Sequence, residues 1–296
     1  THTVYCGTDT RLWDPATEDT AGVRARLGFA RETPLILFAG RMVEQKRPQL
    51  AGEILLALAR RDVDFVAVVA GDGPELTPLT RMLARGGLTD RVRCVGAQPE
   101  EEMRALTATA DIALLPSARE GIALVLYEAM AMQTTPVAAA VGGQGELITP
   151  DCGYLIEQGP DEVERYVAAL TELLSDPERR RVMGEACRAR VVARFDLAVM
   201  GAAMDTEITA AIACGAGVVA LDRADADRRA LIAVQQARRW ELPQAEWANR
   251  GGFRWLALAR QTREKLVPIG SQRYLSYQRL RQRFSKVAVP KRAQSR

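Results

Sequence analysis

Two carboxylates spaced eight residues apart are the side chains of this sequence best placed to do chemistry. Glu120 and Glu128 bound the stretch Glu-Gly-Ile-Ala-Leu-Val-Leu-Tyr-Glu, which follows an apolar run ending at Pro116. If a helix begins near Ala123, Glu128 lies on its second turn and both acids border one pocket. The free N–H groups at such a helix start, and the positive end of its dipole, bind phosphate. The stretch therefore predicts two carboxylates beside a bound phosphate group.

Two cations precede this stretch, at the end of another apolar run. The run from Leu35 to Ala39 has the length of a buried strand and is closed by Gly40, with Arg41 and Lys46 following. Guanidinium and ammonium groups both bind phosphate, so the pair predicts a diphosphate site. An exposed loop with solvated charges is the alternative. The loop is not a Walker loop, because the Gly-Lys-Ser/Thr ending is absent. No Gly-x-Gly-x-x-Gly follows the first strand, which disfavours a nicotinamide-dinucleotide enzyme.

The elements that must hold these residues follow a repeating pattern. Short apolar runs alternate with helix-like segments, which predicts an α/β fold with a doubly wound parallel sheet. The expected strands are residues 35–39, 65–70, 92–95, 112–115, 136–140 and 153–156. In such sheets, ligands bind outside the carboxyl ends of the strands, where the strand order switches. The segments after these strands are rich in glycine and polar residues, which indicates a ligand that contains phosphate.

The second part of the chain differs in pattern and in charge. We expect an α/β domain over residues 1–205 and a helical, basic extension over residues 206–296. Residues 250–296 hold thirteen Lys or Arg against one acid, whereas residues 1–249 hold 27 basic and 36 acidic groups. The basic tail is expected to contact another domain or an anionic membrane surface, with a solvated helix as the alternative. Nucleic acid is disfavoured as a partner of the tail, because the sequence contains no recognisable nucleic-acid-binding motif.

Cysteine usage and hydropathy indicate a cytoplasmic protein, with peripheral contact to the inner face of a membrane through the basic tail. The five cysteines lack any Cys-x-x-Cys pairing, which indicates reduced thiols. No uncharged apolar segment reaches the roughly 20 residues that span a bilayer, and no signal peptide is recognisable. Asp225 and Asp227 imitate a metal-binding Asp-x-Asp, but they lie in an arginine-rich stretch, so no metal is expected.

Five stretches, in the expected order, resemble those of one enzyme family. The segment from Ser117 to Ala131 resembles the Glu-x7-Glu signature of the retaining family-four glycosyltransferases. The others resemble the segment that enters their second domain, their diphosphate loop, their third-strand turn and a later glycine loop, and span residues 6–15, 38–48, 69–74 and 142–148. The resemblance covers residues 1 to about 205. It implies the donor-binding half of a GT-B enzyme, in which two Rossmann-like domains face one another across a cleft.

The resemblance implies a nucleoside-diphosphate sugar as donor substrate, with no metal and no cofactor. Arg41 and Lys46 would hold the diphosphate, together with Gly40 and the backbone at Leu124. The acceptor-binding domain would precede Thr1, since the chain opens without Met, and we expect the isolated chain to bind the donor without transferring sugar.

The resemblance also implies separate roles for the two acids. Glu128 would bind the ribose hydroxyls. Glu120 would contact the donor sugar and support the charge that develops during transfer, assisted by the backbone of Gly121, Ile122 and Ala123. Such a site must stabilise a departing diphosphate and an oxocarbenium-like sugar more strongly than the ground state.

Four positions depart from the family pattern. Cys6 replaces an Asn, Ile122 and Ala123 replace Phe-Gly, and Gln133 stands for a glycine. The changes at Ile122, Ala123 and Gln133 motivate a second hypothesis, a non-catalytic nucleotide-sugar-binding or scaffold module of a multidomain protein. A dehydrogenase is the third.

Overall fold

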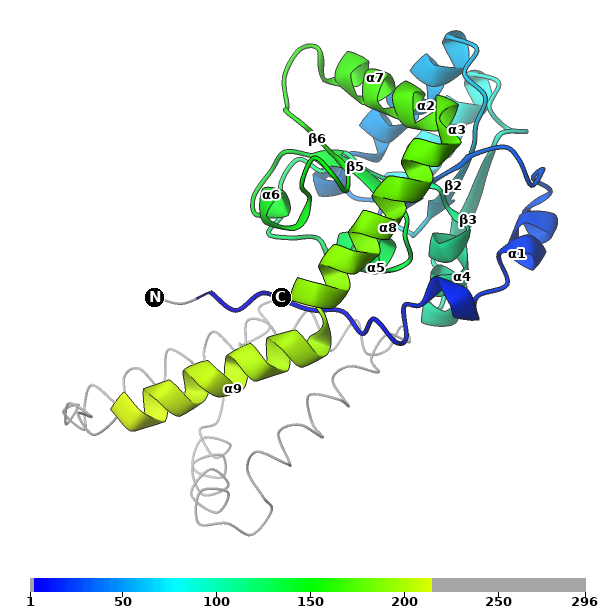
Figure 1. Cartoon of the computed structure of the whole chain (residues 1–296). Helices are drawn as coiled ribbons and strands as arrows, with labels where there is room; N and C mark the ends of the chain where they lie inside the picture. The colour runs from blue at the N-terminus through cyan, green and yellow to red at the C-terminus, as the bar shows by residue number, and fades with distance from the viewer. Residues whose placement is uncertain (1–2, 215–296) are drawn as a thin grey trace, which may run out of the picture. The chain divides into compact units, whose positions relative to one another are not determined.

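Residues 3–214 are described by the computed structural model, and they form an α/β domain around one parallel sheet (Figure 1). The strands are β1 (Leu35–Ala39), β2 (Val66–Ala70), β3 (Val92–Gly96), β4 (Ile112–Leu115), β5 (Thr135–Ala139) and β6 (Tyr154–Ile156). All five neighbouring pairs are parallel. Each predicted strand is present with its ends shifted by at most one residue, so the fold class is confirmed.

The strand order is β3-β2-β1-β4-β5-β6. The chain adds β2 and then β3 on one side of β1, and afterwards returns to place β4 against its other side. The connections that leave β1 and β4 therefore run in opposite directions from two adjacent strands. This is a topological switch point, where open α/β sheets bind their ligands.

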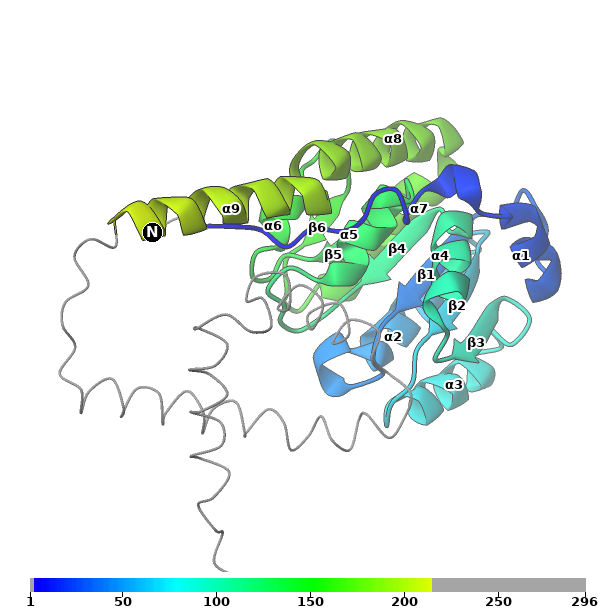
Figure 2. The same ribbon diagram turned by 90° about the horizontal axis from the view of Figure 1, so that it is seen from below.

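Helices cover both faces of the sheet. They are α1 (Thr20–Leu27), α2 (Pro48–Arg60), α3 (Leu76–Arg85), α4 (Glu100–Thr109), α5 (Leu124–Ala131), α6 (Gln144–Leu147), α7 (Glu162–Ser175), α8 (Pro177–Arg194) and α9 (Leu197–Cys214). Figure 2 shows α2 and α3 on one side of the sheet and α5 and α8 on the other. Side chains of β1 alternate between the layers, because Ile36 and Phe38 join the core beneath α2 and α7 while Leu35 and Leu37 join the core beneath α1 and α4.

Local sequence explains several helix ends. The Asp19 carboxylate accepts a hydrogen bond from the Gly22 N–H at the start of α1, and Gly28 ends this helix in the left-handed conformation. Pro48 opens α2, and Pro177 opens α8 behind an Asp176 cap.

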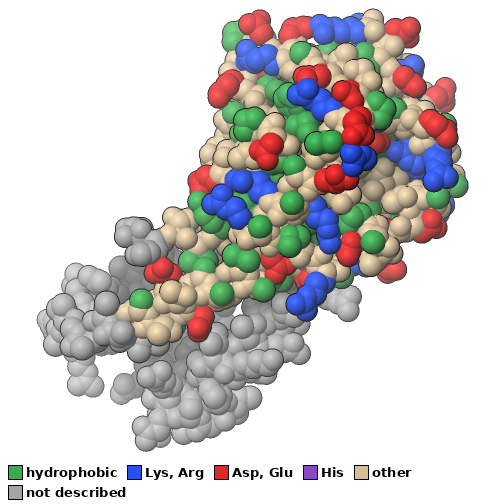
Figure 3. Space-filling model, in the orientation of Figure 1, with side chains coloured by type: hydrophobic (Ala, Val, Ile, Leu, Met, Phe, Trp, Pro, Cys, Tyr) green, Lys and Arg blue, Asp and Glu red, His purple; other side chains and the backbone are tan. Residues whose placement is uncertain are grey.

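The N-terminal segment is fastened to the junction of α8 and α9. The Thr8 N–H donates to the Phe195 carbonyl, and the Leu197 N–H donates back to the Thr8 carbonyl. The helix α9 continues through the boundary expected after residue 205, and exposes Val199, Met204 and Ile208. Figure 3 shows few charged side chains along α9, whereas charges of both signs are interspersed over the rest of that face.

Several sequence expectations fall outside the described residues. They include the basic tail and the Asp225-x-Asp227 stretch, so the division into two domains stays a prediction. No helix within residues 3–214 is both long and apolar enough to cross a membrane.

Candidate functional site

Four loops converge at the carboxyl edge of the sheet, beside the switch point. They follow β1, β2, β4 and β5, and they approach so closely that glycine is required. A Cβ on Gly71, whose φ is 139°, would lie 1.8 Å from the Gly40 carbonyl oxygen. A Cβ on Gly142, whose φ is 56°, would lie 1.9 Å from the Glu120 carbonyl oxygen. The glycines that the sequence places after these strands thus allow the loops to pack into one surface.

The strongest contact in this surface joins two residues that the sequence singled out. Lys46 lies at the end of a 3-10 turn (Glu44–Lys46) after β1, and Glu120 lies in the loop between β4 and α5. The Lys46 Nζ is 2.6 Å from the Glu120 Oε1, and the two side chains are 13% and 9% exposed. The ammonium and the carboxylate therefore neutralise one another in a largely water-excluded position.

Backbone contacts fix the two loops relative to one another. The Ala118 N–H donates to the Gln45 carbonyl oxygen at 2.8 Å, and the Gln45 side-chain amide donates to the Arg119 carbonyl oxygen at 3.0 Å. From the other side, the Gln158 amide donates to the Ala118 carbonyl oxygen at 3.0 Å. The segment before Glu120 is thus held from two directions, which limits where its carboxylate can lie.

A second ion pair anchors the end of the β1 loop. The Arg47 guanidinium forms two parallel hydrogen bonds to the Glu162 carboxylate, at 2.7 and 2.8 Å. Glu162 is 4% exposed and begins α7, while Arg47 adopts the left-handed backbone conformation just before Pro48. The bidentate geometry defines the direction in which the loop enters α2. Sequence analysis missed the roles of Gln45, Arg47 and Glu162, because their partners lie far away in the chain.

The other cations of this edge are exposed. Arg41 follows Gly40, whose N–H donates to the Ala70 carbonyl oxygen at 3.0 Å, and Arg119 directly precedes Glu120. Neither guanidinium has a hydrogen-bond or ion-pair partner within residues 3–214. Arg119 was not among the predicted site residues, although its place beside Glu120 in the sequence is a signal for it. Both side chains are available to an anionic ligand.

The helix α5 begins where the sequence predicts. Ala123 is its N-cap residue, with extended backbone and no side-chain cap, and Leu124 is 55% exposed. The first N–H groups of the helix therefore have no partner from a capping side chain. Ile122 is half-buried, and a Cβ on Gly143 would lie 2.9 Å from its Cγ1, so this side chain packs against the loop after β5. The Gly143 N–H donates to the Gly121 carbonyl oxygen at 2.7 Å, which ties the same loops together.

Glu128 occupies the second turn of α5, as expected from its spacing. Its side chain is half-buried and has no hydrogen-bond or ion-pair partner in the described part of the chain. Burial, and to a smaller extent repulsion from Glu100, raise the pKa of Glu128 to about 7. An unpaired carboxylate in such a place favours a ligand that donates hydrogen bonds, as hydroxyl groups do.

Comparison with known proteins is consistent with this arrangement. Residues 20–190 match the sequence model of the family described as glycosyl transferases group 1. A GDP-mannose-dependent monoacylated alpha-(1-6)-phosphatidylinositol monomannoside mannosyltransferase of Corynebacterium glutamicum is 32% identical over 203 residues, which are 66% of this chain and 52% of that protein. The chain spans about half the length of the curated relatives it matches.

Solved structures share the fold. Sucrose-phosphate synthase from Thermosynechococcus elongatus superposes with a TM-score of 0.64 at 26% identity, covering 72% of this chain and 53% of that one. Anabaena Alr3699/HepE in complex with UDP-glucose superposes with a TM-score of 0.63 at 22% identity, covering 71% of this chain and 57% of that one.

Proposed function

The chain belongs to the glycosyl transferases group 1 family, and from this premise we propose that it is the donor-binding half of a retaining glycosyltransferase. Its substrate would be a nucleoside-diphosphate sugar. The observation that carries the proposal is the contact between Lys46 and Glu120 at the switch point, because it joins a phosphate-binding cation to a carboxylate suited to the sugar. The acceptor would be bound by a domain outside this chain.

The diphosphate would lie between the β1 loop and the start of α5. Lys46, Arg41 and the N–H groups at Leu124 offer positive charge from separate loops, and Gly40 allows the ligand to approach the backbone. Arg119 adds another exposed cation at the same edge. These groups would stabilise the negative charge that develops on the diphosphate as its bond to the sugar breaks.

Donor binding would exchange the partner of Lys46. A diphosphate carries more negative charge than a single carboxylate, so it competes with Glu120 for the ammonium group. Glu120 would then turn toward the donor sugar, next to the backbone of Gly121, Ile122 and Ala123. There its carboxylate would stabilise the positive charge of an oxocarbenium-like transition state more than it stabilises the bound substrate. This gives Glu120 the catalytic role.

The ribose of the donor would meet Glu128. Two vicinal hydroxyls donate hydrogen bonds to one carboxylate, and these bonds favour its ionised form. The half-buried, unpaired position of Glu128 suits this role. Names of relatives and structural neighbours include GDP-mannose and UDP-glucose, which are both nucleoside-diphosphate sugars and differ in base and sugar. The proposed donor is therefore described by its class, a nucleoside-diphosphate sugar.

One observation favours a second candidate, a non-catalytic nucleotide-sugar-binding module. Ile122 packs against the loop at Gly143, since a Cβ on Gly143 would lie 2.9 Å from the Ile122 Cγ1. If this packing displaced the donor sugar from Glu120, the site would still hold a nucleoside diphosphate on Lys46 and Glu128 but would not transfer the sugar. Under either candidate the protein would act in the cytoplasm, with the basic tail in contact with an anionic membrane surface.

Calorimetric titration of the chain with UDP-, GDP- and ADP-sugars tests the proposal. We expect at least one donor to bind, and we expect Lys46→Ala to weaken that binding. Arg31→Ala should leave it unchanged, because this exposed arginine precedes β1 and the donor loops follow the strands. Sugar transfer by the full-length protein would distinguish the transferase from the module. Absence of binding by every donor, or equal binding by the Lys46→Ala variant, would overturn the proposal.

A further inference from the structure

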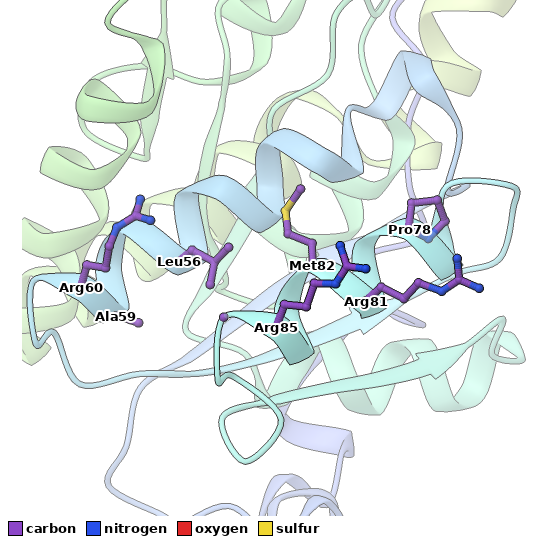
Figure 4. A pocket seen from close by; sticks show the side chains of 8 residues that line it. Leu56, Ala59, Arg60, Pro78, Arg81, Met82 and Arg85 are labelled. Carbon is purple, nitrogen blue, oxygen red and sulfur yellow. The ribbon is translucent and has the colours of Figure 1, made fainter.

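A hollow of about 780 Å³ lies between α2 and α3, and none of the residues that line it belongs to the four loops of the donor site (Figure 4). Its lining residues are Leu56, Ala59, Arg60, Pro78, Arg81, Met82, Arg85 and Gly86. Leu56 and Met82 are half-buried and give it an apolar floor, whereas the three arginines are exposed at its rim. It thus combines an apolar surface with concentrated positive charge.

Glycines let the two helices approach closely along this hollow. A Cβ on Gly86 would lie 2.0 Å from the Leu56 Cδ2, and a Cβ on Gly52 would lie 2.8 Å from both the Met82 sulfur and the Leu79 Cδ1. The side chains of Leu56 and Met82 therefore occupy the seam between the helices. Their position is fixed by this packing, so the floor of the hollow is preformed.

The arginines of the rim lack internal partners. Arg60, Arg81 and Arg85 have no hydrogen-bond or ion-pair partner within residues 3–214, and no carboxylate lines the hollow. Arg81 and Arg85 are four residues apart on α3, so their like charges face the same side of the helix (Figure 4). Elsewhere in the domain, arginines such as Arg47 and Arg24 pair with buried or half-buried acids. An anion in the hollow would relieve this unbalanced charge.

We infer that this hollow binds an anionic phospholipid, with the phosphate on Arg81 and Arg85 and part of the apolar chain on Leu56 and Met82. Its volume is in the range of about 300–1,000 Å³ that is typical of small-molecule sites. Inorganic phosphate would leave the apolar floor exposed, whereas a phospholipid uses both parts.

This site is separate from the donor site and does not rest on the proposed function. It would attach the α2 and α3 face to a lipid surface in addition to any contact made by the basic tail. Because the tail is present in every variant of the full chain, its contribution to vesicle binding is a constant background. Substitutions in the hollow isolate the contribution of this site.

The test is co-sedimentation of the full chain with phosphatidylglycerol–phosphatidylcholine vesicles and with phosphatidylcholine vesicles alone. The matched variants are Arg81→Ala/Arg85→Ala in the hollow and Arg11→Ala/Arg31→Ala at two exposed positions elsewhere. Each basic residue near an anionic surface contributes a factor of about five in partition, so the hollow variant should lose roughly thirtyfold. The control variant should lose clearly less, and circular dichroism should show both folded.

A second variant tests the apolar floor. Met82→Gln keeps every charge, so we expect it to weaken binding of a soluble short-chain phosphatidylglycerol and to leave any binding of inorganic phosphate unchanged. Equal losses for the hollow and control variants, or no effect of Met82→Gln on the short-chain lipid, would overturn the inference. So would competition by an acidic peptide that binds the hollow more tightly than the lipid does.

Discussion

The Lys46 Nζ lies 2.6 Å from the Glu120 Oε1, although the two residues are 74 positions apart in the chain. The pair exists because β1 and β4 are neighbours in the sheet, so the loops that follow them emerge side by side. Both side chains are largely buried, and removing one partner leaves the other charge uncompensated. In the proposed function, a donor diphosphate takes over Lys46 and frees Glu120 for the sugar.

Lys46→Ala should weaken donor binding by roughly tenfold to a hundredfold, since a hydrogen bond to a charged group contributes about 1.5–3 kcal/mol. Lys46→Arg keeps the charge and should retain more affinity. Calorimetry measures both, and thermal unfolding shows whether the unpaired Glu120 destabilises the fold. Equal affinities of the wild-type and Lys46→Ala proteins would exclude Lys46 from the diphosphate site.

Glu120→Gln separates binding from transfer. The substitution removes a charge while it keeps the shape, so donor affinity should change by less than about tenfold. Transfer by the full-length protein should fall by roughly 10² to 10³, as it does when one preorganised electrostatic contact to a transition state is lost. If both quantities fell together, Glu120 would be a binding residue rather than a catalytic one.

Glu128 should make both donor affinity and stability depend on pH. Its pKa is raised to about 7, so the carboxylate that would accept bonds from ribose forms as the pH rises through 7, and donor affinity should increase between pH 6 and pH 8. Glu128→Gln should remove this increase. Glu101→Gln, an exposed acid at the start of α4, should leave it in place.

Stability should change in the opposite direction. A carboxyl whose pKa is higher in the folded state than its model value of 4.5 binds its proton more tightly when folded, so the free energy of unfolding decreases as the pH rises from 4.5 through 7. The loss is on the order of 2–3 kcal/mol. Glu128→Gln should therefore raise the melting temperature at pH 8 relative to wild type, and change it little at pH 4. If the difference in melting temperature between Glu128→Gln and wild type were the same at both pH values, the result would contradict the buried, unpaired state of this acid.

Gly71→Ala should disrupt the surface on which the donor would lie. Its Cβ would collide with the Gly40 carbonyl oxygen, and its φ of 139° is unfavourable for any other residue. We expect the substitution to cost about 2 kcal/mol or more in stability and to reduce donor affinity. Gly87→Ala is the matched control, because Gly87 also has a positive φ but no atom within 4 Å of its added Cβ. The difference in stability between the Gly71→Ala and Gly87→Ala proteins measures the cost of placing a Cβ where the two loops approach closely.

The sequence predicted the strands well because β1, β2, β4 and β5 are short, wholly buried apolar runs, as Leu35–Ala39 illustrates. Local spacing also predicted where α5 starts and that Glu128 lies on its second turn. Local spacing could not predict the partner of Lys46, because this contact depends on β4 returning to the side of β1, which no local pattern encodes. Arg47 and Glu162 are 115 residues apart, and the hollow between α2 and α3 arises from side chains of two helices. Such contacts require the assembled fold.

The ion pair of Arg47 and Glu162 should stabilise the domain and hold the β1 loop in place. Glu162 is almost fully buried, so Arg47→Met leaves an uncompensated carboxylate and should cost on the order of 2–3 kcal/mol, as should Glu162→Met through the unpaired guanidinium. The double variant should be more stable than the sum of the two losses predicts, because both charges are then absent. Chemical denaturation of the four proteins measures this coupling. The exposed pair of Arg61, at the end of α2, and Glu164, in α7, provides the control. A double-mutant cycle on this pair should give a coupling energy of no more than about 0.5 kcal/mol.

Donor titrations of the same four proteins show whether this pair also acts on the site. Arg47 directly follows Lys46 in the chain, so loss of its anchor should let the β1 loop move and weaken donor binding in both single variants. The Arg61 and Glu164 variants should bind the donor as wild type does. Unchanged donor affinity in the Arg47→Met and Glu162→Met proteins, despite the loss of stability, would show that the hydrogen bonds between Gln45 and the segment 118–119 suffice to place Lys46.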